Sequence, residues 1–236
     1  MYYAIFGFLF GFIIPYMARR FAKFMPATPA YAVYRLIKPH VSVSKRKKLS
    51  NPQYQKLCRR YFMRSLGWAI VCAALSWLTK AGLEQYGCAA IFCTGFLWTL
   101  LLLSEIDTRM YILPDILTFP LLLFGFLFSV TCGFINPLES ALASLVGFFL
   151  PVIASAFLVW KDKNALGGGD IKLFSAIGAW MGVELLLYVV ILSSFLFGIA
   201  SILKRQRSGA FGPSIVLATI IVAFWVFSGI PYKLNF

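Results

Sequence analysis

The chain has 236 residues and is strongly apolar: 61% of its residues are hydrophobic, only 13% are charged, and the mean hydropathy is +0.83. A water-soluble domain is closer to half apolar and a quarter charged. This composition excludes a disordered chain, a collagen-like fibre and a water-soluble enzyme, and it predicts an all-α, polytopic membrane protein. We interpret the net charge of +14 as an orientation signal within a lipid bilayer, so no nucleic-acid partner is expected.

Charge-free segments predict about eight transmembrane helices, because a helix needs roughly 20 apolar residues to cross the hydrocarbon core. In chain order the segments are 1–18, 65–79, 85–104, 116–138, 140–160, 173–183, 185–203 and 208–232. The first has no positive region before it, which favours a retained helix over a cleaved signal peptide. The sixth is the shortest and follows three glycines, so it can be a short helix buried among the others.

The basic residues predict the orientation of these helices. Residues 19–64 contain thirteen Lys or Arg residues and no Asp or Glu. With eight spans and this loop in the cytosol, twenty of the twenty-two basic residues lie on the cytosolic side. Both termini are therefore expected outside. The chain divides into residues 1–84, which hold the first helices and the basic cytosolic loop, and residues 85–236, a second membrane domain.

Several carboxylates are expected at the cytosolic face. Asp107 ends the third span and Asp170 opens the sixth, so two distant parts of the sequence present acids at the same depth. Carboxylates near a bilayer are costly and are functional candidates by default. Asp115 follows a proline and is expected to be a helix N-cap, or a third carboxylate that supports the site. Glu105 and Asp162 are interpreted as ordinary helix-end residues.

Paired carboxylates permit one hydrolytic mechanism that needs no other functional group. Two carboxylates a few ångströms apart hold one proton between them, so that one acts as general base toward water and the other donates to a peptide carbonyl. His40 is the only histidine, and we do not expect it to have the partners that a His-based zinc site or a Ser-His-Asp triad would need. The five cysteines form no C-x-x-C pair, so no metal site is expected. A proton-coupled transporter would also keep paired aspartates and is the main alternative.

Three glycines, Gly167, Gly168 and Gly169, directly precede Asp170. Without Cβ atoms they allow an extended peptide to approach the carboxylate closely. A flexible linker is the alternative interpretation of such a run, although a linker has no reason to end on an acid before a hydrophobic helix.

These motifs resemble those of the type IV prepilin peptidase family, the GxGD membrane aspartic proteases of bacteria. Residues 106–115 are similar to its I-D-x-R…L-P-D signature, and residues 167–173 with 176–180 are similar to its G-x-G-D-x-K-L…G-A-W block. Residues 211–213 are similar to its F-G-P motif. The order and spacing agree from about residue 85 to the end, which makes 85–236 the expected aspartic peptidase domain.

The resemblance implies that Asp107 and Asp170 are the catalytic aspartates of a multi-pass protein of the bacterial inner membrane. Such enzymes cut the basic leader of prepilins or pseudopilins after a glycine, at the cytosolic edge. Gly167, Gly168, Gly169 and Asp115 are candidates for substrate binding or site support. Lys172 and Arg109 either support the aspartates or mark the inner face.

Many members also methylate the new N-terminus with S-adenosylmethionine, and often bind zinc in a first loop that has two C-x-x-C pairs. This chain has one cysteine in that loop, Cys58, so zinc is not expected. Methylation remains open. An assembly scaffold that binds pilins without cutting them is a further alternative.

Overall fold

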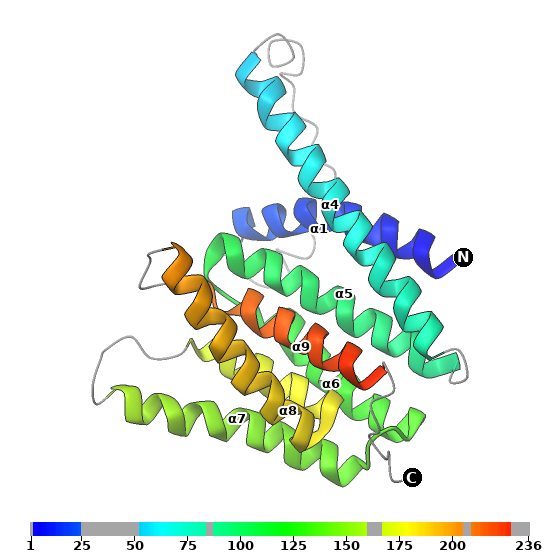
Figure 1. Cartoon of the computed structure of the whole chain (residues 1–236), viewed down its shortest axis with the longest axis vertical. Helices are drawn as coiled ribbons and strands as arrows, with labels where there is room; N and C mark the ends of the chain where they lie inside the picture. The colour runs from blue at the N-terminus through cyan, green and yellow to red at the C-terminus, as the bar shows by residue number, and fades with distance from the viewer. Residues whose placement is uncertain (1, 25–51, 84–86, 160–166, 205–208, 228–236) are drawn as a thin grey trace. The chain divides into compact units, whose positions relative to one another are not determined.

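The computed structural model describes residues 2–24, 52–83, 87–159, 167–204 and 209–227, and every regular element within these ranges is a helix (Figure 1). The helices are α1 (Tyr2–Phe24), α4 (Pro52–Gly82), α5 (Gly87–Met110), α6 (Asp115–Cys132), α7 (Pro137–Val159), α8 (Gly168–Lys204) and α9 (Gly212–Phe227). The expected all-α architecture is confirmed. Asp162 and most of the basic loop lie outside the described residues.

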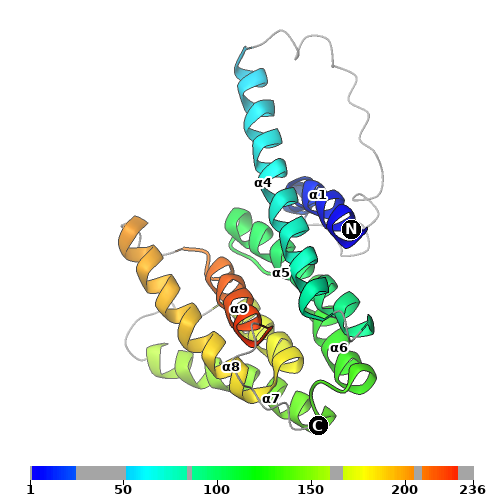
Figure 2. The same ribbon diagram turned by 45° about the vertical axis from the view of Figure 1, so that its right-hand side comes forward.

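Six of the described helices, α1 and α4 to α8, are long and apolar enough to cross a membrane, and α9 is a shorter apolar helix. The sixth and seventh expected spans are joined in α8. This helix bends at Gly182, where φ is 81° and ψ is 172°. Residues other than glycine rarely adopt this backbone conformation. Figures 1 and 2 show the yellow first half and the orange second half of α8 running in different directions.

The chain separates into two compact units, residues 1–81 and residues 82–236. Unit 1 contains α1 and most of α4. Here Gly7 lies so close to α4 that a Cβ atom would be 2.6 Å from the Cys72 carbonyl oxygen. The Arg19 guanidinium lies 4.5 Å from the centre of the Tyr61 ring. Close backbone approach and a cation–π contact thus join the two helices.

Unit 2 is a helical bundle in which α8 packs against α6, α7 and α9. The Ser140 hydroxyl donates to the Ala179 carbonyl over 2.7 Å, which ties α7 to α8. Trp180 is buried, donates its indole N–H to the Leu121 carbonyl of α6 over 2.8 Å, and stacks on Phe96 with ring centres 4.6 Å apart. Aromatic pairs of this kind contribute about 0.5–1.5 kcal/mol beyond their buried area. In Figure 2, α9 lies between α5 and α8, and it packs against both.

One end of unit 2 collects the helix termini that carry the acids. The end of α5 and the start of α6 are joined by residues 111–114, a connection short enough to make the two helices antiparallel neighbours. Tyr111 has a φ of 56°, and its N–H donates to the Asp107 carbonyl over 2.8 Å, which closes the last turn of α5. The start of α8 and the start of α9 meet the same end through the contacts described next.

Candidate active site

Asp107 is held by the first residue of α9. Its side chain is buried, and its Oδ2 atom accepts a hydrogen bond from the Gly212 N–H over 2.8 Å. The first N–H groups of a helix have no acceptor within the helix, so the carboxylate satisfies one of them. A Cβ atom at Gly212 would lie 2.7 Å from Oδ2, so the close approach requires glycine. The sequence singled out Gly212 only as part of a motif and gave it no role.

Asp170 lies in the first turn of α8 and is half-buried. Its backbone N–H donates to the Gly167 carbonyl over 3.0 Å, which closes that turn. The positive end of the helix dipole favours an acid at this position. The carboxylates of Asp170 and Asp107 are close enough to interact electrostatically. The structure thus brings together the two aspartates that the sequence paired, each beside a helix N-terminus.

The three glycines before Asp170 have different surroundings. A Cβ atom at Gly169 would lie 2.9 Å from the Cβ of Leu113, so this residue packs against the α5–α6 connection. A Cβ atom at Gly167 would lie 3.1 Å from Asp170 Oδ2. At Gly168, no atom of the described residues lies within 4 Å of the same position. Of the three glycines, Gly168 is therefore the one that the described residues leave uncovered, two positions before Asp170.

Asp115 forms an ion pair instead of capping its helix. The N-cap of α6 is Pro114, which makes no side-chain cap, and Asp115 is the first helical residue. The Lys172 Nζ atom lies 2.7 Å from each oxygen of the Asp115 carboxylate. Both side chains are exposed, at 66% for Asp115 and 48% for Lys172. The N-cap prediction was wrong because a cation on α8 engages the side chain. The pair joins the starts of α6 and α8.

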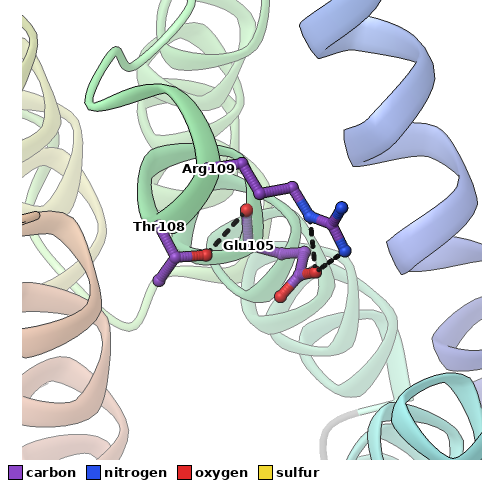
Figure 3. A network of polar contacts seen from close by, with 3 residues as sticks. All are labelled: Glu105, Thr108 and Arg109. Carbon is purple, nitrogen blue, oxygen red and sulfur yellow. Dashed lines mark hydrogen bonds and ion pairs between the residues drawn. The ribbon is translucent and has the colours of Figure 1, made fainter. Parts of the chain in front are cut away.

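Glu105 is buried within α5, and its interpretation as an ordinary helix-end residue was wrong. Its side chain has 0% exposure and pairs with Arg109, which is 17% exposed (Figure 3). The Nε and Nη2 atoms of Arg109 donate to Oε1 over 2.9 and 2.6 Å, and the Thr108 hydroxyl donates to the Glu105 carbonyl over 2.9 Å. The i, i+4 spacing of glutamate and arginine was a usable signal for this pair. Arg109 thus contacts Glu105, two residues before Asp107.

Comparison with known proteins identifies relatives of this chain. Residues 94–202 match the type IV leader peptidase family. A prepilin leader peptidase/N-methyltransferase of Vibrio cholerae serotype O1 is 30% identical over 72% of this chain and 68% of its own length. Proteins of the same name are 31% identical in Neisseria gonorrhoeae, over 71% of this chain and 58% of the relative, and 38% identical in Dickeya chrysanthemi, over 60% and 47%.

The chain spans about half to two thirds of the length of these curated relatives. No solved structure matches it. The chain belongs to the type IV leader peptidase family. This conclusion follows from the family match over 94–202 and from the Vibrio relative, which is 30% identical and is covered over 68% of its length.

Proposed function

We propose that this protein is a membrane aspartic endopeptidase that removes the basic leader of prepilins or pseudopilins, with Asp107 and Asp170 as its catalytic residues. The observation that carries the proposal is the meeting of these two carboxylates at one end of unit 2. Family membership supports the same reaction class, and the names of the relatives supply the substrate class. The proton-coupled transporter gains no support from these names.

The chemistry follows from two carboxylates that share a proton. The ionised group takes a proton from a water molecule, whose oxygen attacks the carbonyl carbon of the scissile peptide bond. The protonated group donates a hydrogen bond to the carbonyl oxygen. The carbon–nitrogen bond then breaks and the leaving amine takes a proton. Asp107 Oδ2 is already engaged by Gly212, which leaves Oδ1 and Asp170 to face the water and substrate.

The substrate reaches the pair from the side of Asp170. Asp107 is buried and Asp170 is half-buried, and the space beside Gly168 is open. An extended peptide that ends its leader with glycine can lie against this stretch of backbone, and cleavage follows that glycine. The carboxylates attract the positive charges of the leader.

The proposed topology has eight spans, with both termini outside the bacterial inner membrane. The bend at Gly182 divides α8 into a sixth and a seventh span, and α9 is the eighth. This arrangement leaves twenty of the twenty-two basic residues on the cytosolic side. It also puts the ends of α5 and α8 that carry Asp107 and Asp170 at the cytosolic edge, where a leader emerges from the membrane.

N-methylation of the new N-terminus is a separate proposal, taken from the names of the relatives, with S-adenosylmethionine as the methyl donor. The described carboxylates at this end of unit 2 are already engaged, Glu105 by Arg109, Asp115 by Lys172 and Asp107 by Gly212. Asp170 belongs to the pair. We therefore expect other residues to form the binding site for S-adenosylmethionine. Proteolysis does not depend on that site.

The test is cleavage of a co-expressed prepilin, followed by mass spectrometry of its N-terminus. Asp107→Asn and Asp170→Asn each remove one ionisable group at constant size, and we expect each to lower cleavage by about a thousand-fold or more. Glu184→Gln makes the same change on the second half of α8 and is expected to leave cleavage intact. Cleavage at the normal rate by either Asn variant would overturn the proposal.

A further inference from the structure

Two cysteines meet at the end of the α5–α6 pair that lies away from the aspartates. Cys88 is the second residue of α5 and Cys132 is the last residue of α6. Their sulfur atoms are 3.1 Å apart, and both are free thiols. Because α5 and α6 are antiparallel, the start of one faces the end of the other. Cys88 is about 28 Å along α5 from Asp107, at 1.5 Å per residue.

We propose that Cys88 and Cys132 form a disulfide that fastens α5 to α6 at the outer face of the membrane. A disulfide bond is about 2.05 Å long, so the two sulfur atoms need to approach by about 1 Å more. The Cys88 side chain is exposed, which lets an oxidant reach it. The sequence assigned no role to this pair, because the five cysteines form no C-x-x-C motif.

The compartment favours oxidation, and this step rests on the orientation given under the proposed function. With both termini outside, α5 begins and α6 ends on the outer side, facing the bacterial periplasm. Disulfides form and persist in that compartment. If α5 and α6 had the opposite orientation, the two thiols would face the reducing cytosol and would stay reduced.

The reaction needs a disulfide-bearing protein oxidant of the periplasm. The Cys88 thiolate attacks the oxidant's disulfide, forming a mixed disulfide and releasing one thiolate of the oxidant. The Cys132 thiolate then attacks Cys88 Sγ, which closes the internal bond and releases the oxidant as a dithiol. The chain loses two hydrogen atoms, and the oxidant gains them.

Cys93 is the competing partner. It lies five residues further along α5, is half-buried, and is near enough to Cys132 to interact with it. The short sulfur contact of Cys132 is with Cys88, however, and Cys88 is the more exposed of the two. The proposal therefore names Cys88, and variants at Cys93 decide between the two.

The experiment counts free thiols in the full-length protein within bacterial membranes. Cells are quenched in acid, and the membranes are alkylated with a polyethylene-glycol maleimide before and after reduction. With five cysteines, the wild type is expected to show three reactive thiols before reduction and five after. Cys88→Ser and Cys132→Ser should show four in both states, and Cys93→Ser should show two before and four after.

Five reactive thiols in the unreduced wild type would overturn the proposal, and so would a Cys93→Ser variant that shows four reactive thiols before reduction. Labelling of thiols from the outer side of the membrane tests the orientation of the helices separately from the disulfide. A membrane-impermeant maleimide that labels Cys88 in wild-type spheroplasts would overturn the disulfide and leave the topology standing. Prepilin cleavage in the same membranes is read independently, and Cys88→Ser and Cys132→Ser are expected to cut at the wild-type rate.

Discussion

The two aspartates of the pair have contrasting surroundings, although they lie close enough to interact electrostatically. Asp107 is buried, hydrogen-bonded by the start of α9, and two residues from the enclosed Glu105–Arg109 ion pair. Asp170 is half-buried beside the open space at Gly168 and near the exposed Asp115–Lys172 ion pair. This difference suggests a division of tasks: the protein fixes one carboxylate by packing and leaves the other accessible to substrate.

We expect the largest effect from a substitution on the buried side, near Asp107. Arg109→Ala removes the cation from a fully buried Glu105, and breaking a buried ion pair in this way costs about 3–5 kcal/mol of unfolding free energy. We expect a large fall in the thermal unfolding temperature of the protein in detergent. Arg109→Lys keeps the charge and should recover part of the loss. Unfolding of Arg109→Ala at the wild-type temperature would show that the pair does not stabilise this region.

Gly212→Ala perturbs the position of Asp107 directly. The added methyl group would lie 2.7 Å from Oδ2 and 3.0 Å from Cγ of Asp107, so the carboxylate or the start of α9 must move. A displacement of about 1 Å in a catalytic group can lower the rate about a hundred-fold. The measurement is the prepilin cleavage rate at saturating substrate. Gly198→Ala in α8 is the matched control and should cut normally, because a Cβ atom there meets no atom within 4 Å in the part of the chain that the structure describes.

Gly168→Ala tests whether the substrate binds on the accessible side, near Asp170. The described residues leave space for the methyl group, so we expect the folded protein to be as stable as the wild type. If the substrate backbone lies there, the methyl group hinders binding, and KM rises by about tenfold with kcat less affected. The check is cleavage at varied prepilin concentrations. An unchanged KM would place the substrate elsewhere.

Lys172→Met should have the smallest effect. The ion pair with Asp115 is exposed, and such pairs contribute about 0–1 kcal/mol. We expect a shift in unfolding temperature close to the error of the measurement and a cleavage rate within a few-fold of wild type. Asp115→Asn should match it, since both remove the same contact. A loss as large as that of Arg109→Ala would mean that the exposed pair supports the site.

The sequence predicted the helices and the proximity of Asp107 to Asp170, because hydropathy and the positive-inside rule predict the same membrane depth for both acids. Depth does not specify which side of a helix faces the bundle. Glu105 was therefore taken for a helix-end residue, although its spacing from Arg109 indicated a pair. The contact of Gly212 with Asp107 joins helices far apart in the chain, and no local pattern encodes it.

The sequence also did not predict two features of the helix ends. The Asp115 side chain was assigned to its own helix terminus, since nothing local shows that Lys172 of α8 approaches it. The break in α8 was expected around Glu184 and occurs at Gly182. A glycine two residues before an acid leaves several positions possible for the turn, and packing against α7 decides among them, since a Cβ atom at Gly182 would lie 2.7 Å from Glu139 Oε1.

The central claim, that the two carboxylates act as one unit, is tested by the initial rate of leader cleavage for Asp107→Asn, Asp170→Asn and the double variant in the same membranes. Two groups that share one proton fail together, so the account predicts that the double variant is no slower than the slower single variant. Losses that multiply in the double variant, or wild-type cleavage by either single variant, would contradict it.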